Sequence, residues 1–172
     1  MKRLLIVIDM QNDFVSGVLG TQEARQILPA INRKIEEAER VIFTRDTHNE
    51  GYLSTQEGRK LPVAHCIAGS WGHALAEGLL LPEGSCCIDK PTFGSVELAQ
   101  EVCRLFSEGE IHRVELMGVC TDICVISNAM LIKAFCPELP VAVDSRCCAG
   151  VTPESHERAL KAMEACQIDV IY

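Results

Sequence analysis

Short runs of consecutive apolar residues alternate along this chain with longer segments in which apolar residues recur at helical spacing. The apolar runs predict six strands, at Arg3–Asp9, Arg40–Asp46, Cys86–Asp89, Arg113–Val119, Val141–Ser145 and Asp169–Ile171. The helical spacing predicts four helices, at Glu23–Ala38, Ser95–Phe106, Asp122–Phe135 and Pro153–Cys166. Strands that are apolar at nearly every position are buried on both faces, which is typical of parallel sheets. We therefore expect an α/β fold in three layers (α/β/α) around a mostly parallel six-stranded sheet.

The domain organisation follows from the length and the regularity of this pattern. At 172 residues the chain can bury a substantial core without metal or disulfide staples. No internal repeat, low-complexity tract or linker interrupts it, so we expect a single domain over residues 1–172. The segment Thr47–Gly72 fits neither period, and a loop of that length in a compact domain is usually functional or disordered.

Charge and composition exclude several classes of partner. The net charge of −8 leaves no basic face for a nucleic acid. No apolar run approaches the length of a membrane span, and no polybasic cluster would bind an anionic membrane. The first apolar stretch is followed at once by Asp9 rather than by a cleavage site, so we expect a cytoplasmic protein. The ten cysteines then predict free thiols, a metal site or catalysis rather than a disulfide framework.

A candidate nucleophile lies where the predicted strand ending at Val119 passes into a helix. Cys124 falls in the first turn of that helix, and the positive end of a helix lowers the pKa of a thiol. The alternative is that Cys124 merely packs in the core. By composition alone, Cys120 is a second candidate for the attacking thiol.

Three predicted strands end in side chains of complementary chemistry. The first ends at Asp9, the third leads to Lys90, and the fourth leads to Cys124. Ligands bind at the carboxyl ends of strands in open parallel sheets, so these residues are expected to meet. An ammonium stabilises a thiolate, and a carboxylate can take the thiol proton and pass it to a leaving group. Taken singly, Asp9 could be a turn residue and Lys90 a solvated lysine; their joint placement favours catalysis.

A candidate metal site begins where the second predicted strand ends. Asp46 and His48 follow that strand, His65 lies near the end of the long loop, and Glu57 lies between them. Nitrogen and oxygen ligands of this kind suit Zn²⁺, Mn²⁺ or Fe²⁺. The alternative is that the two histidines are ordinary loop residues that cap backbone groups.

Three blocks of this sequence resemble the signature blocks of the isochorismatase-like cysteine hydrolases. The blocks are residues 8–14 (IDMQNDF), 89–95 (DKPTFGS) and 118–125 (GVCTDICV). The resemblance runs from the first strand to the last helix. It implies the family's isochorismatase-like fold, with Asp9 as acid/base, Lys90 as the cation that stabilises the thiolate, and Cys124 as nucleophile.

The same resemblance implies an oxyanion hole at the candidate nucleophile. Its donors would be the backbone N–H groups of Cys120 and Cys124. In this family a cis peptide bond holds the hole open, and here that bond would join Val119 to Cys120. Cys120 is thereby placed at the hole rather than at the attacking position.

Nicotinamidases are one branch of this family, and their metal ligands resemble the pattern in the long loop. The likeness implies one divalent metal, zinc first and manganese or iron as alternatives, held by Asp46, His48, Glu57 and His65. It implies a small-molecule amide substrate, with nicotinamide converted to nicotinate and ammonia through a thioester on Cys124. Family relatives are commonly dimers or tetramers, so we expect a homo-oligomer.

Aromatic residues near these motifs are candidates for the walls of a substrate pocket. Phe14, Phe93 and Trp71 could lie against the flat faces of an aromatic ring, although plain core packing is the alternative for each. The block that follows Lys90 is only loosely like the nicotinamidase version. Two other functions therefore stay open: another hydrolase of this family acting on a different small amide, carbamoyl group or vinyl ether, and a non-catalytic metal-binding or redox protein on the same scaffold.

Overall fold

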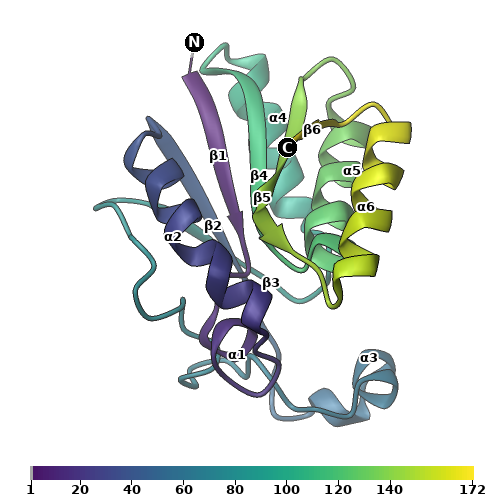
Figure 1. Cartoon of the computed structure of the whole chain (residues 1–172). Coiled ribbons are helices and arrows are strands. Elements are labelled where there is room, and N and C mark those ends of the chain that lie inside the picture. Colours follow the sequence, from purple (N-terminus) through teal and green to yellow (C-terminus); the bar gives the residue numbers. More distant parts are fainter. Residues whose placement is uncertain (1) are drawn as a thin grey trace.

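Six parallel strands form the centre of the molecule in the computed structural model, which describes residues 2–172 (Figure 1). In chain order they are β1 (Lys2–Ile8), β2 (Arg40–Asp46), β3 (Cys86–Lys90), β4 (Ile111–Val119), β5 (Val141–Ala149) and β6 (Asp169–Ile171). Their order across the sheet is β3-β2-β1-β4-β5-β6, and every neighbouring pair is parallel. The predicted strands and the parallel sheet are therefore confirmed, with β5 running four residues further than expected.

Helices cover both faces of this sheet, as the three-layer prediction requires. Helix α2 (Gln22–Glu36) lies on one face, and α4 (Val96–Ser107), α5 (Ile126–Phe135) and α6 (Pro153–Ala165) pack side by side on the other (Figure 1). The helix expected from Asp122 onward instead begins with a π-helical turn, η2 (Thr121–Val125), and then continues as α5.

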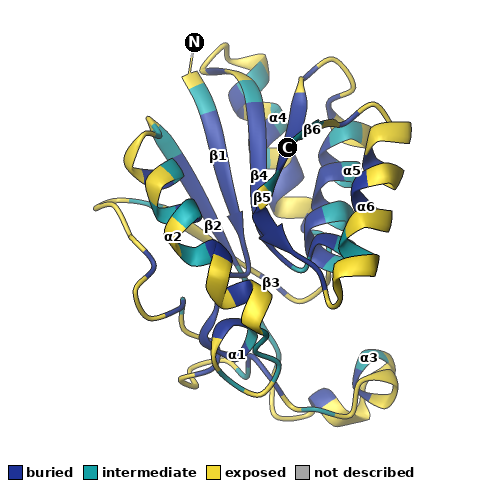
Figure 2. Ribbon diagram, in the orientation of Figure 1, coloured by how far each residue is buried: buried dark blue, intermediate teal, exposed yellow. Residues whose placement is uncertain are grey.

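The core follows directly from the continuous apolar strands. Residues 4–8 of β1 are fully buried, and Figure 2 shows the strands buried while the outer sides of the helices are exposed. Burial of each large aliphatic side chain contributes about 1.5–3 kcal/mol, so a central strand apolar on both faces anchors the sheet. Among the described residues, no helix is long and apolar enough to cross a membrane.

The carboxyl ends of the strands carry the irregular part of the chain. A short helix, α1 (Asn12–Val15), follows β1, and the long segment between β2 and β3 contains η1 (Tyr52–Ser54) and α3 (Gln56–Lys60). In Figure 1 these elements lie beyond the end of the sheet toward which the β1 arrow points. The long loop is thus ordered around two short helical turns.

The cysteines correct one prediction. Cys103 in α4 and Cys136 at the end of α5 form a disulfide with a Cα–Cα distance of 5.8 Å. The expectation of free thiols is wrong for this pair, because α4 and α5 pack together and bring two distant cysteines into bonding distance. The other eight cysteines are free.

Candidate active site

Two strands approach each other closely just before the site. Gly118 of β4 has φ +118°, and a Cβ atom there would lie 2.1 Å from the carbonyl oxygen of Ile8. Only glycine fits at that approach. The next residue after β1 is Asp9, which has φ +48°. The tight contact between β1 and β4 brings Asp9 close to η2, the turn that carries Cys124.

The structure brings Asp9, Lys90 and Cys124 together in one buried cluster. The ammonium of Lys90 lies 2.7 Å from Oδ2 of Asp9 and 3.4 Å from Sγ of Cys124. Their exposed fractions are 0%, 1% and 5% in the order Asp9, Lys90 and Cys124. Thr44 of β2 donates its hydroxyl hydrogen to Oδ1 of Asp9 at 2.6 Å, and Lys90 also donates to the carbonyl of Thr92 at 3.1 Å. The carboxylate and the ammonium are thus both fixed by neighbours.

Burial shifts the pKa values of the three groups in this cluster. It raises the pKa of the Cys124 thiol well above its ordinary value, and the Asp9 carboxylate adds to this while Lys90 opposes it. Burial also raises the pKa of Asp9. For Lys90 burial acts in the opposite sense, but the negative charge of Asp9 raises the pKa of the ammonium above its usual range. The helix terminus was expected to lower the pKa of Cys124; burial and the Asp9 carboxylate act in the opposite direction.

The residues predicted to form an oxyanion hole lie at the turn that carries Cys124. The Val119–Cys120 peptide bond is cis, and both Cys120 and Cys124 line the cavity described below. The carbonyl of Cys120 accepts hydrogen bonds from two N–H groups of η2, each at 3.0 Å. Burial raises the pKa of the Cys120 thiol to about 12, and its carboxylate neighbour Asp122 adds to this.

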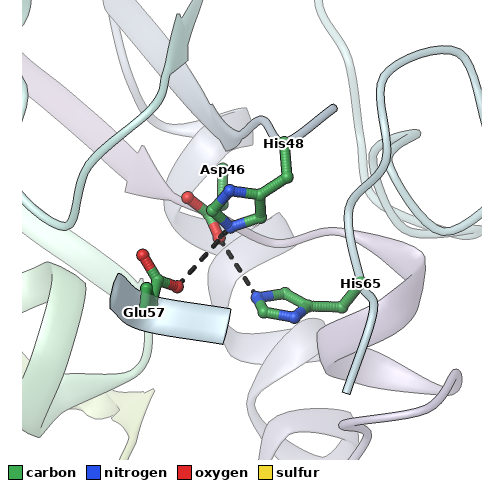
Figure 3. A group of neighbouring side chains, drawn as sticks. All are labelled: Asp46, His48, Glu57 and His65. Atoms are coloured by element: carbon green, nitrogen blue, oxygen red, sulfur yellow. Dashed lines mark hydrogen bonds and ion pairs between the residues drawn. The ribbon is translucent and has the colours of Figure 1, made fainter. Parts of the chain in front are cut away.

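Four side chains converge at the end of β2 (Figure 3). Asp46, His48, Glu57 and His65 each offer one ligand atom, and these atoms all lie within 4.8 Å of one another. Nε2 of His48 lies 2.9 Å from Oδ2 of Asp46 and 3.6 Å from Oε1 of Glu57. Nε2 of His65 lies 3.5 Å from the same Asp46 oxygen.

The chemistry of these four groups fits a divalent metal ion. Nδ1–H of His65 can donate to the carbonyl of Val63, which lies 2.8 Å away; with an ion in place, Nε2 would lose its hydrogen bond to Asp46 and offer its lone pair for coordination instead. Oδ1 of Asp46 is buried without a hydrogen bond and lies 3.5 Å from the Lys90 ammonium. Although burial acts to raise it, hydrogen bonds from His48 and His65 hold the pKa of Asp46 well below its usual range. Two imidazoles and two carboxylates suit zinc and similar ions.

A cavity of about 620 Å³ joins the two groups. Its lining includes Cys120 and Cys124 together with Asp46, Glu57 and His65. Much of the remaining wall is apolar and consists of Phe14, Leu19, Leu61, Phe93, Ile123 and Val151. A small organic molecule in this cavity could therefore contact both the thiol and members of the four-ligand group.

Two of the three aromatic residues predicted to form the pocket wall line the cavity, and the third does not. Phe14 and Phe93 line the cavity, and the Phe14 ring centroid lies 5.5 Å from that of His65. Trp71 is not part of the lining; its side chain is 54% exposed and its indole N–H donates to Glu77 at 3.0 Å. The sequence does not show whether the ring of an aromatic loop residue points into the cavity or toward solvent.

Sequence reasoning also missed residues that hold the site in place. Tyr52 is buried against the rings of His48 and His65, with centroid distances of 4.5 and 4.9 Å, and its hydroxyl donates to the carbonyl of Leu61 at 3.1 Å. Thr44 supports Asp9 as described above. No sequence motif marks either residue, because their roles depend on which segments the fold brings together.

Comparisons with known proteins identify the family of this chain. A family model, the isochorismatase domain, matches residues 3–172. An uncharacterized isochorismatase family protein PncA from Bacillus subtilis is 30% identical over 174 residues, covering 93% of each chain. A nicotinamidase from Schizosaccharomyces pombe is 26% identical, covering 97% of this chain and 91% of the relative. The crystal structure of the pyrazinamidase of Pyrococcus horikoshii in complex with zinc is 28% identical, with a TM-score of 0.81 and 99% of each chain covered.

Proposed function

The chain belongs to the isochorismatase family, and we propose that it is a cysteine-dependent amidohydrolase of a small amide. The substrate that fits best is nicotinamide, which would yield nicotinate and ammonia. One observation carries the proposal: Cys124, whose sulfur lies 3.4 Å from the Lys90 ammonium, lines the same cavity as Asp46, Glu57 and His65, three members of the four-ligand group. The nicotinamidase and pyrazinamidase relatives support it.

The proposed first half-reaction begins from the neutral thiol. Asp9 takes the proton from Cys124 as the sulfur adds to the amide carbonyl carbon. The carbonyl oxygen takes the electron pair and rests against the backbone N–H groups of Cys120 and Cys124. Each such donor stabilises the transition state by roughly 3–4 kcal/mol in comparable sites. Asp9 then returns the proton to the amide nitrogen, the C–N bond breaks, and ammonia leaves behind a thioester.

The second half-reaction removes the acyl group. Asp9 takes a proton from a water molecule, whose oxygen adds to the thioester carbonyl, and the C–S bond breaks. Lys90 lies 3.4 Å from the sulfur and stabilises it as it leaves with negative charge. The sulfur then regains its proton from Asp9, so the site returns to a thiol beside an ion pair.

Asp46, His48, Glu57 and His65 would hold one divalent metal ion, with zinc first and manganese or iron as alternatives. A bound ion of this kind supplies a Lewis acid that can hold a pyridine nitrogen and so orient a ring for attack. Phe14 and Phe93 would contact the faces of that ring. We also propose a homo-oligomer, by analogy with family relatives, which size-exclusion chromatography with light scattering would test.

Ammonia release tests the proposed reaction. We expect wild-type protein to deaminate nicotinamide and pyrazinamide faster than aliphatic amides or carbamoyl compounds in one panel. Cys124→Ala should lower kcat/KM by at least about a thousandfold, because the nucleophile is removed. Cys166→Ala, at an exposed cysteine after α6, is the matched control and should keep wild-type activity.

Three outcomes would overturn parts of this scheme. Substantial activity in Cys124→Ala together with a loss in Cys120→Ala would move the nucleophile to Cys120. Absence of turnover across the whole panel would remove the amidohydrolase proposal. For the metal, elemental analysis of protein purified without chelators should find about one equivalent, which is lost in Asp46→Ala; a metal-free and fully active enzyme would contradict the metal site.

A further inference from the structure

Asn128 lies one helical turn after Cys124, near the start of α5, and only 1% of it is exposed. Its side-chain amide makes three hydrogen bonds, all to backbone groups. Nδ2 donates to the carbonyl of Cys124 at 2.8 Å and to the carbonyl of Phe93 at 3.0 Å. Oδ1 accepts from the N–H of Ser95 at 2.9 Å. Both amide hydrogens and the oxygen of this buried group therefore have partners.

These contacts join two segments that are distant in sequence. One is the turn that carries Cys124. The other is the loop 91–95 between β3 and α4, which begins directly after Lys90, and whose Thr92 carbonyl accepts from the Lys90 ammonium at 3.1 Å. Phe93 of this loop lines the cavity. Asn128 thus links the nucleophile's backbone to the loop that holds the cation and one apolar wall.

The loop also lies beside the helix, close enough for van der Waals contact. A Cβ atom at Gly94 would lie 3.4 Å from the carbonyl oxygen of Ser127. Ser95 is in addition the N-cap of α4, since its hydroxyl accepts from the N–H of Leu98 at 3.1 Å. The loop is therefore tied to α4 at one end and to α5 through Asn128.

We propose that Asn128 is a positioning residue for the reaction: it sets the distance between Lys90 and Cys124 and the place of Phe93 in the cavity. The inference rests on the proposed function for its kinetic effect, although its effect on the thiol does not. Asn128 touches neither the substrate nor the reacting atoms. The three hydrogen bonds need a side chain of this length with one acceptor and two donor hydrogens. Aspartate has no donor hydrogens, and leucine has neither donors nor an acceptor.

Two substitutions separate positioning from helix stability. Asn128→Ala removes all three hydrogen bonds. Asn128→Ser keeps a hydroxyl that can donate to the carbonyl four residues earlier, which is that of Cys124, but cannot reach the loop. We expect both variants to lose at least tenfold in kcat for nicotinamide, with a smaller change in KM. If Asn128→Ala does not fold, Asn128→Ser still carries the test.

The second readout is independent of amide turnover. Alkylation of Cys124 by iodoacetamide at fixed pH, followed by mass spectrometry of the modified peptide, should slow at least fivefold in both variants, because the ammonium no longer sits against the sulfur. Asn32→Ala is the matched control, since this asparagine joins α2 to a remote loop through the carbonyl of Gly78 and the N–H of Leu80. It should alter neither rate.

The outcomes are distinguishable. Wild-type kcat and wild-type alkylation in Asn128→Ser, measured well below its thermal midpoint, would overturn the positioning role and leave Asn128 a residue of stability only. If wild-type protein turns over none of the amides, the proposed function fails. The alkylation rates then decide the role of Asn128 by themselves: slowing supports it and unchanged rates refute it.

Discussion

Lys90 should support the fold as well as the proposed chemistry, and its replacement by methionine tests its part in the fold. Its ammonium lies 2.7 Å from Asp9, and it is the only ion-pair partner of Asp9 among residues 2–172. Both side chains are fully buried, at 0% exposure. Lys90→Met therefore leaves a carboxylate in the interior without its counter-charge.

The size of the effect follows from this geometry. At 2.7 Å and an effective dielectric constant of about 20, the attraction between the two charges is about 6 kcal/mol before desolvation is subtracted. Removal of one partner of a buried pair costs about 3–5 kcal/mol, whereas replacement of both by neutral groups is often close to neutral. We expect Lys90→Met to lower the free energy of unfolding by about 3–5 kcal/mol, and Asp9→Asn/Lys90→Met to recover most of that loss.

Urea unfolding followed by circular dichroism measures these free energies by linear extrapolation. All proteins are dialysed against the same chelator so that metal loading does not differ among them. Lys161→Met, at an exposed lysine of α6, is the matched control and should stay within about 0.5 kcal/mol of wild type. A double variant no more stable than Lys90→Met would refute the reasoning, because the loss would then come from packing rather than from an uncompensated charge.

Three further predictions concern the rest of the fold. The ammonium of Lys34 lies 2.7 Å from Asp144, and although burial acts to raise it, hydrogen bonds from Arg146 and Lys34 hold the pKa of Asp144 below its ordinary value. Lys34→Met should lower the free energy of unfolding at pH 7 by about 1–3 kcal/mol. The Asp144 carboxylate binds its proton more tightly in the unfolded state, so this difference from wild type should shrink as the pH falls below about 4. An equal difference at pH 3 would contradict this reasoning. Cys103→Ser opens a disulfide that spans 33 residues, which should cost about 4 kcal/mol in guanidinium unfolding; a reductant should destabilise the wild type and leave the variant unchanged. Gly118→Ala forces a Cβ atom to 2.1 Å from a carbonyl oxygen of β1 at φ +118°, so we expect a loss of more than about 3 kcal/mol, and a thermal midpoint near that of wild type would refute the close approach.

The residues at the strand ends were predictable because a parallel sheet places the carboxyl ends of all its strands at one edge. Once apolar runs are read as parallel strands, the residues that follow them must share one edge, and Asp9, Asp46 and Lys90 do. Cys124 belongs to the same set because its turn follows β4 directly. The ligand group around Asp46 was predictable for a related reason, since two of its members sit within three residues of a strand end.

Contacts between loops were not predictable in the same way. Tyr52 and Asn128 act through partners 9 and 33 residues away, Leu61 and Ser95, and nothing in their own neighbourhood in sequence identifies those partners. The same holds for Cys103 and its disulfide, which depends on how α4 lies against α5. Trp71 was misplaced because composition does not say which side of a loop faces the cavity.

The resting state of the thiol changes what Lys90 contributes to catalysis. A thiolate at rest would already have its full attraction to the ammonium, and that attraction would not lower the barrier. In the proposed mechanism the proton passes from Cys124 to Asp9 as the sulfur attacks, an order that burial favours because it raises the pKa of the thiol. As the proton reaches Asp9, the negative charge passes from that carboxylate through the sulfur to the carbonyl oxygen of the substrate, to which the backbone N–H groups of Cys120 and Cys124 would donate. The attraction between Lys90 and the sulfur is therefore strongest while the sulfur carries part of this charge, and again when the sulfur leaves the thioester.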